Sequence, residues 1–365
     1  MKRVLLIGLA AAMLAVAGAG SASAAGPFIN GFHRIRDVAS TVPANGDVNP
    51  YGTVVVQRSA GRLMAGSVLV SNFNAKSNLQ GTGTTIVEIT PSGHRTVFSH
   101  ITRDSLPGRC PGGVGLTTAL AVLRHGWVIV GSLPTRNGMA ATARAGCLIV
   151  INSMGMPVET ISGHPINGPW DMTWSESQHR ARLFVTNVLN GTVAAGGGTV
   201  RRGTVVRVTL GLRGAMPAVR SETVIGSGFP EHTDPAALVV GPTGDGLSSS
   251  GTLYVADSVK NRIAAIPNAM TRTSSAGRGM TVDRGGALND PLGLTMAPNG
   301  NILTVNGNDG RIVETTPGGH QVAVRFLDSS GSPPGAGALF GLAVAPGGRG
   351  LYFVDDATNM LDLLH

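Results

Sequence analysis

The sequence predicts an all-β protein built from copies of one small antiparallel sheet, and three observations support this prediction. First, the stretch from Leu288 to Phe326 holds four apolar runs, each too short for a helix and bounded by breakers. Second, two of the three gaps between these runs carry Pro-Asn-Gly or Pro-Gly-Gly, which are strong turn signals. Third, the features of this stretch recur along the chain, and a four-stranded sheet that cannot bury both faces alone needs such copies.

Two features mark each repeat. The start of the first strand, Asp290-Pro291-Leu292-Gly293, recurs in units that begin near residues 50, 116, 169, 235, 291 and 339, the fourth unit starting at Asp234-Pro235-Ala236-Ala237. The second strand with its polar end, Ile302–Asn306, recurs as Val68–Asn72, Trp127–Gly131, Leu183–Asn187, Leu253–Asp257 and Leu351–Asp355. Six such units of four antiparallel strands predict a six-bladed β-propeller.

The last unit lacks a fourth strand, because the chain ends after a third strand at Asn359–Leu364. The segment His33–Val42 is strand-like and precedes the first unit. We expect this segment to supply the missing outer strand, because that would close the ring and remove an exposed sheet edge. The alternative is that His33–Val42 is only a leader.

The first 24 residues have the pattern of a secretory signal peptide. Lys2 and Arg3 precede an apolar stretch, and Ala22-Ser23-Ala24 is a small-residue cleavage site. The apolar run is short for a membrane span, and no charge cluster follows it. We therefore expect residues 25–365 to form a single soluble propeller domain that is secreted or periplasmic, without a membrane span.

The charge pattern argues against nucleic acid as a partner. Removing Lys2 and Arg3 lowers the formal net charge from +8 to +6, and the remaining basic residues are mostly scattered. Only 4% of the residues are aromatic, whereas nucleic-acid-binding proteins cluster basic residues on one face, often with aromatics. We interpret the charge as a solvated basic surface and expect a monomer.

The chain has two cysteines, Cys110 and Cys147. An even number in an exported protein favours a disulfide, and neither cysteine belongs to a Cys-x-x-Cys or metal-binding spacing. We therefore predict a structural Cys110–Cys147 disulfide.

Two stretches of the repeats resemble the NHL repeat signature. They are Asp257–Ile263, which follows Leu253-Tyr254-Val255-Ala256, and Asp290–Leu294 through Gly310-Arg311-Ile312. The resemblance implies a six-bladed propeller of the TolB-like or SMP-30/gluconolactonase-like kind. It does not imply one activity, because this architecture hosts lactonases, lyases and binding proteins.

Two rings of polar residues are expected on the face where such propellers usually bind ligands. One ring ends the second strands and comprises Asn72, Asn187, Asp257, Asn306 and Asp355; the other precedes the first strands and comprises Asn49, Asn167, Asp234 and Asp290. Such oxygen ligands suit Ca²⁺, and the resemblance to calcium-dependent lactonases points to the same ion. The alternative is that these residues form turns, because Asp and Asn side chains bond the nearby backbone.

Asp171 departs from the repeat pattern. Its equivalents in the other units, Gly52, Thr118, Ala237, Gly293 and Gly341, are small and uncharged. We therefore expect Asp171 to be the charged member of any channel site, with Trp170 beside it and Asn187 and Asp257 as further metal ligands. The alternative is an Asp that only bonds a backbone amide.

The sequence favours a binding protein over an enzyme. We expect the channel face to bind a small molecule, a glycan or a protein. The alternatives are a Ca²⁺-dependent, lactonase-like hydrolase or lyase and a purely structural envelope protein. No nucleophile motif assigns catalytic residues, and His100, His164 and His232 do not match the histidine positions of amidating lyases with NHL repeats, so exposed loop histidines are the simpler interpretation.

Overall fold

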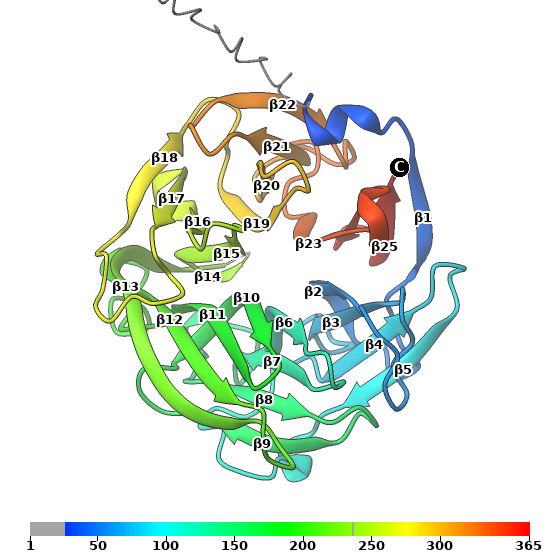
Figure 1. Ribbon diagram of the computed structural model, residues 1–365, viewed down its shortest axis with the longest axis vertical. Helices are drawn as coiled ribbons and strands as arrows, with labels where there is room; N and C mark the ends of the chain where they lie inside the picture. Colours follow the sequence, from blue (N-terminus) through cyan, green and yellow to red (C-terminus); the bar gives the residue numbers. More distant parts are fainter. Residues whose placement is uncertain (1–25, 236) are drawn as a thin grey trace, which may run out of the picture.

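The computed structural model describes residues 26–235 and 237–365. The predicted signal peptide, residues 1–24, and Ala236 lie outside the described residues. The described part of the chain forms six antiparallel sheets arranged as blades around a central axis (Figure 1). The predicted all-β, six-bladed propeller is therefore confirmed.

Each blade is a sheet of at least four strands, ordered from the axis outward. Blade 1 holds β2 (Val48–Val55), β3 (Val68–Asn74), β4 (Thr85–Ile89) and β5 (Arg95–His100); blade 2 holds β6 (Leu116–Val122), β7 (Val128–Ser132), β8 (Cys147–Ile151) and β9 (Pro157–Ile161); blade 3 holds β10 (Gly168–Ser177), β11 (Arg180–Val188), β12 (Val200–Gly211) and β13 (Ala218–Asp234), with the short β14 (Leu238–Val240) added.

The second half of the ring repeats this order. Blade 4 holds β15 (Pro242–Leu247), β16 (Leu253–Asp257), β17 (Arg262–Ile266) and β18 (Met280–Arg284); blade 5 holds β19 (Pro291–Met296), β20 (Ile302–Asn306), β21 (Arg311–Thr315) and β22 (Gln321–Phe326); blade 6 holds β23 (Leu339–Val344), β24 (Leu351–Asp355), β25 (Met360–Leu364) and β1 (Ile35–Ser40).

The described helices are short 3₁₀ turns in the connections: η1 (Phe28–Gly31), η2 (Arg103–Ser105), η3 (Ala140–Thr142), η4 (Ser258–Lys260) and η5 (Pro346–Gly348). No helix in residues 26–235 and 237–365 is long and apolar enough to cross a membrane.

The N-terminal strand closes the ring, as the sequence predicts. Strand β1 pairs antiparallel with β25, from Ile35 opposite Leu364 to Ser40 opposite Met360 (Figure 1). The N–H of Thr41 extends the pairing by donating to the carbonyl of Asn359 at 2.9 Å. Without β1, the backbone groups of β25 would form an exposed sheet edge.

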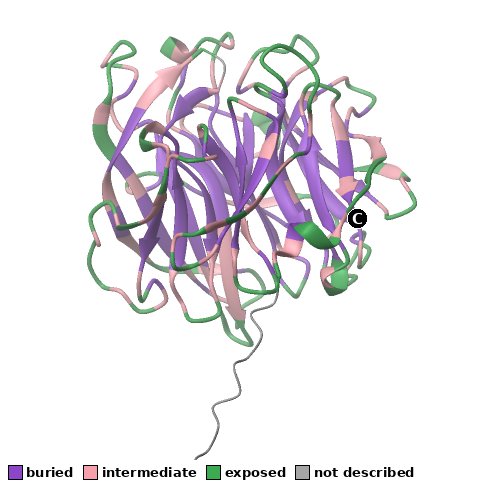
Figure 2. Cartoon of the chain, turned by 90° about the horizontal axis from the view of Figure 1, so that it is seen from above, coloured by how far each residue is buried: buried purple, intermediate pink, exposed green. Residues whose placement is uncertain are grey.

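The apolar core lies between neighbouring blades. For example, Val54, Leu69 and Ile86 of blade 1 belong to one buried cluster with Leu120 and Ile149 of blade 2. Burying such a side chain contributes roughly 1.5–3 kcal/mol relative to leaving it exposed. The edge-on view shows buried residues in the strands through the middle of the molecule, with exposed residues concentrated in the loops (Figure 2).

Cys110 and Cys147 form a disulfide, with Cα atoms 5.3 Å apart, so this prediction is confirmed. Cys147 begins β8, and Cys110 lies in the connection that leads from blade 1 into β6. The bond therefore ties the connection to the third strand of the blade that it enters.

The two ends of the propeller differ in their loops. At one end, which we call the crossover face, the chain passes from one blade to the next and the innermost strands begin. At the other end, the hairpin face, each innermost strand turns into its second strand. The loops of the hairpin face are residues 56–67, 123–127, 178–179, 248–252, 297–301 and 345–350.

Candidate functional site

A cavity of about 260 Å³ lies among the innermost strands of the propeller. All six innermost strands contribute residues, and these come from the later half of most strands, toward the hairpin face. We call this space the channel cavity. Its polar lining comprises Thr53, Gln57, Thr118, Asp171, Thr173, Asp245 and Thr295, and its other lining residues include Leu120, Trp174, Leu294, Leu342 and Val344.

The opposite end of the channel is filled by apolar side chains. Tyr51 and Phe340 stack with ring centroids 3.9 Å apart, and Trp170 lies 6.3 Å from Tyr51. Leu238 of β14 and Leu292 belong to the same buried cluster. Trp170 therefore lies at the channel, as predicted, but it packs into this apolar cluster. The sequence predicts a ligand at the crossover face, whereas the channel cavity lies toward the hairpin face.

Asp171 occupies a position where glycine stands in four other blades and where a side chain would clash with the next blade. The register of the innermost strands aligns it with Gly52, Gly244, Gly293 and Gly341. A Cβ added to Gly293 would lie 1.8 Å from the carbonyl oxygen of Phe340, and one added to Gly341 would lie 2.2 Å from that of Tyr51. Glycine therefore lets adjacent innermost strands approach closely, whereas the boundary between blades 3 and 4 leaves room for a carboxylate.

Asp245 is a second carboxylate in the channel cavity, and the sequence analysis missed it. The fourth innermost strand is Pro242–Leu247, so the predicted start at Asp234-Pro235 is wrong, and the equivalent of Asp171 in blade 4 is Gly244 rather than Ala237. Asp234 instead ends β13, and Leu238–Val240 form β14, beside blade 3. The motif Gly241-Pro242-Thr243-Gly244-Asp245, which resembles Gly168-Pro169-Trp170-Asp171, is the signal that would have found this residue.

The two carboxylates are buried together, with few hydrogen bonds and no basic side chain to offset the loss of water. Asp171 and Asp245 are 9% and 3% exposed, and the residues lining the cavity include no Lys, Arg or His. One oxygen of Asp171 accepts a hydrogen bond from the N–H of Met172 at 2.8 Å. Neither oxygen of Asp245 has a hydrogen-bond partner of good geometry among the described residues.

Burial raises the pKa of both groups. The pKa of Asp171 rises to about 7 because of desolvation, and the backbone N–H groups of Met172 and Asp245 oppose this rise. The pKa of Asp245 is raised well above its ordinary value by desolvation and then by the charge on Asp171, with the N–H of Thr173 acting against it. The pair therefore retains at least one proton near neutral pH.

The asparagines predicted at the ends of the second strands make backbone contacts. Both Asn167 and Gly168 donate their N–H groups to the side-chain oxygen of Asn187 at 2.8 Å, and its amide donates to the carbonyl of Pro165. Asn306 accepts from the N–H of Asn289 and donates to the carbonyl of Ala287. Asn72 donates to the carbonyl of Thr41. These contacts hold the connections that enter blades 1, 3 and 5.

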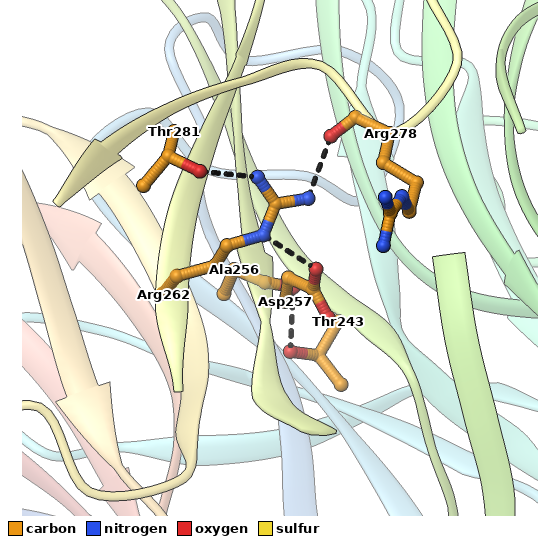
Figure 3. Close-up of polar contacts among 6 residues, drawn as sticks. All are labelled: Thr243, Ala256, Asp257, Arg262, Arg278 and Thr281. Carbon is orange, nitrogen blue, oxygen red and sulfur yellow. Dashed lines mark hydrogen bonds and ion pairs between the residues drawn. The ribbon is translucent and has the colours of Figure 1, made fainter. Parts of the chain in front are cut away.

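Asp257 is occupied by a buried ion pair. Its Oδ2 lies 2.7 Å from Nε of Arg262, and both side chains are at most 5% exposed (Figure 3). The same guanidinium donates to Oγ1 of Thr281 at 2.9 Å and to the carbonyl of Arg278 at 2.7 Å. Arg262 thus fastens the second strand of blade 4 to its outer strand.

Asp355 lies in blade 6, away from the pair in the channel cavity. One of its oxygens accepts a hydrogen bond from the N–H of Thr358 at 3.2 Å. Burial and the charge of Asp328 raise its pKa.

Of the four residues predicted to precede the first strands, Asn167 and Asp234 bond the backbone through their side chains. Asn49 and Asp290 have φ values of 61° and 57°, a conformation that Asn and Asp tolerate better than most residues. Asn167 donates its side-chain amide to the carbonyl of Leu189 at 2.7 Å, and Asp234 accepts from the N–H of Ala237 at 2.8 Å. The contacts of Asn167 and Asp234 are those of turn-forming residues, and the φ values of Asn49 and Asp290 also suit a turn.

The predicted calcium ligands do not form a coordination site. The oxygen of Asn187 is used by two N–H groups and Asp257 is paired with Arg262, so these two residues offer Asp171 no shared set of free oxygen atoms. Ca²⁺ takes six to eight oxygen ligands. Within residues 26–235 and 237–365, no group of three His, Cys, Asp or Glu side chains is arranged to hold a metal. The donor set therefore does not fit Ca²⁺.

Comparisons with known proteins agree on the fold. No protein-family model matches the sequence, and no curated protein matches it. Among solved structures, the calcium-binding protein regucalcin from Agrobacterium tumefaciens is 14% identical, with a TM-score of 0.58 over 90% of this chain and 93% of that one. A gluconolactonase from Xanthomonas campestris is 12% identical, with a TM-score of 0.55 over 90% and 88%. A streptogramin B lyase is 14% identical, with a TM-score of 0.51 over 91% and 97%. At these identities, the similarity shows the six-bladed propeller and not a shared activity.

Proposed function

We propose that this protein is an exported propeller that binds a small molecule in the channel cavity, with a cationic group of the ligand placed against Asp171 and Asp245. The observation that carries the proposal is the buried pair of carboxylates in a cavity whose lining holds no basic side chain. A bound cation would relieve the repulsion between the two charges. An ammonium or guanidinium group would also supply donors to the oxygens of Asp245.

The size of the cavity favours a small molecule over a glycan chain or a protein. Pockets for drug-sized ligands usually span about 300–1,000 Å³. The channel cavity, at about 260 Å³, accepts a compact group of a ligand. It lies among the innermost strands, where a folded partner would not reach Asp171.

Export rests on two features. The predicted signal peptide at residues 1–24 supplies the route, and the Cys110–Cys147 disulfide suits an oxidising compartment. The secreted or periplasmic location belongs to this proposal.

Hydrolysis or elimination by the same pair is a second candidate function. Two interacting carboxyls, one of them with a pKa of about 7, provide a general acid and a general base near neutral pH. The structural similarity to a gluconolactonase and a lyase makes lactone hydrolysis and elimination the reactions to test. Lactone opening by the purified protein, lost in Asp171→Asn and in Asp245→Asn, would support it.

Isothermal titration calorimetry with butylamine and hexylamine tests the binding proposal. We expect both amines to bind the wild-type protein and to raise its melting temperature with concentration. Affinity should increase from about pH 6 to about pH 8, because the amine replaces the proton held by the pair, in which the pKa of Asp171 is about 7.

Three variants test whether the amines bind at the carboxylate pair. Asp171→Asn and Asp245→Asn should each lose most of the amine binding. Asp104→Asn, an equal change at an exposed residue of η2, should bind as the wild type does. The proposal fails if neither amine binds, or if the channel variants bind amines as tightly as the wild type.

A further inference from the structure

A second hollow lies beside the channel cavity at the hairpin face. It has a volume of about 360 Å³ and is lined by Gln57, Arg58, Val122, Leu123, Arg124, Trp174 and Glu176. We call it the mouth hollow. Gln57 and Trp174 also line the channel cavity, so the two spaces share these side chains as walls.

The mouth hollow has the opposite charge to the channel cavity. Arg58 and Arg124 come from the loops that follow the innermost strands β2 and β6, and both are exposed. Neither takes part in an ion pair among the described residues. Glu176 is the acidic residue of the hollow, and its Oε2 accepts the backbone N–H of Arg124 at 2.9 Å. The lining charge is thus +1, from two Arg and one Glu, against two carboxylates in the channel cavity.

Trp174 connects the two charged regions. It is partly buried, packing against the apolar clusters of blades 1 and 2 and of blades 2 and 3. The Trp174 side chain is therefore held by its surroundings and forms an apolar wall shared by the cavity of the carboxylate pair and the hollow of the arginines. An aliphatic segment of a ligand would pack on such a wall.

We propose that the ligand is a small amphoteric molecule that carries an amine at one end and a carboxylate at the other. The amine lies against Asp171 and Asp245, the aliphatic middle lies along Trp174, and the carboxylate reaches Arg58 and Arg124, whose planar guanidinium groups suit a carboxylate. This inference rests on the proposed function and names the ligand class for the same site.

The test compares amines with and without a terminal carboxylate. The matched probes are butylamine with γ-aminobutyrate and hexylamine with ε-aminocaproate, titrated by calorimetry into the full chain. In at least one pair, the amino acid should bind about two- to fivefold more tightly than the amine, the range that exposed ion pairs provide. The gain should shrink at high salt, because the arginines are exposed.

Variants at the arginines separate the two ends of the site. The double variant Arg58→Gln/Arg124→Gln should remove the advantage of the amino acid and leave the affinity for the simple amine unchanged. Arg349→Gln, in another loop of the hairpin face and outside the lining of the mouth hollow, should keep the advantage. A melting curve of each variant shows whether it is folded.

The outcomes distinguish this inference from the proposed function. If amines bind and need Asp171, but neither amino acid gains over its amine, the amphoteric ligand is wrong and the cationic site stands. The inference is also wrong if the arginine double variant weakens amine and amino acid alike. If no amine binds the wild-type protein, the proposed function and this inference fall together.

Discussion

Asp171 lies on the innermost strand next to that of Asp245, whose pKa is raised first by burial and then by the charge of Asp171, and no basic side chain lines the cavity that they share. Two buried carboxyls in this relationship cannot both ionise without a large free-energy cost. The folded protein therefore keeps a proton that the unfolded chain releases at neutral pH. This difference links the stability of the propeller to pH.

We expect Asp171→Asn to stabilise the protein at pH 8 and to stabilise it less at pH 5. The pKa of Asp171 is raised in the folded state to about 7 from an ordinary value of 3.8. Between these values the folded state binds more protons, so the free energy of unfolding falls as pH rises through this window. The amide removes this penalty, worth on the order of 2–4 kcal/mol. Urea unfolding at both pH values measures it.

Asp104→Asn is the control for this pH dependence, because Asp104 is exposed. A pH-independent change in the stability of Asp171→Asn would contradict the linkage. Destabilisation at pH 8 would show that the charged form of Asp171 is needed to hold the strand, as in the interpretation that it only bonds a backbone amide.

Gly293→Ala should destabilise the protein, whereas Asp171→Ala at the equivalent position of blade 3 should not do so at pH 8. The new Cβ of residue 293 would lie 1.8 Å from the carbonyl oxygen of Phe340, so blades 5 and 6 would have to move apart. Overpacking of this kind typically costs about 1–3 kcal/mol. Chemical denaturation compares the two variants, and equal stability of Gly293→Ala and the wild type would show that the blades separate easily.

The sequence predicts the fold well because the fold repeats. Each blade needs apolar strands of similar length and turns at similar spacing, so an error in one unit is corrected by the others. The missing fourth strand of blade 6 is a further constraint, because it points to His33–Val42 as the closing strand, and β1 (Ile35–Ser40) lies within that segment.

The candidate site is less predictable because it lies where the repeat is broken. Asp171 is visible as a departure from glycine, but its partner Asp245 is hidden when the fourth unit is taken to start at Asp234-Pro235 instead of Gly241-Pro242. Both sequences contain a proline after a turn-forming residue, and only the pairing with Asp257 distinguishes them. The charge of the mouth hollow depends on which hairpin loops lie side by side, and no local sequence pattern predicts which loops do so.

The ring of Asp and Asn residues shows a related limit. Asp257 has the same place in its repeat as Asn187, but it forms an ion pair with Arg262, whereas Asn187 binds the backbone N–H groups that enter its blade. The repeat position predicts a polar group at the strand end. The repeat position does not predict the partner of that group, because a long side chain from an adjacent strand, such as Arg262, can reach it.

Arg262→Gln should strongly destabilise the protein without weakening amine binding. The change leaves Asp257 buried without its cation, and breaking a buried pair in this way typically costs about 3–5 kcal/mol. The double variant Asp257→Asn/Arg262→Gln should recover part of the loss, since neither member is then charged. Urea unfolding gives the stabilities. Amine binding that disappears in the folded double variant would place Asp257 in the ligand site after all.

Deleting residues 26–42 should cause loss of folding or aggregation. The deletion removes β1 and leaves the backbone groups of β25 unpaired, and it takes Val38 and Ala39 from a cluster that contains Val354 and Leu361. Deleting only residues 26–32 is the control, because this change removes η1 and its two hydrogen bonds to Glu314 but keeps β1. Size-exclusion chromatography and urea unfolding compare both with the wild type.

A synthetic peptide of residues 33–42 should restore a monomeric, cooperatively unfolding protein when it is added to the longer deletion, because closure needs only the paired strand and not its covalent link. A longer deletion that is monomeric and as stable as the wild type would show that the ring holds without β1.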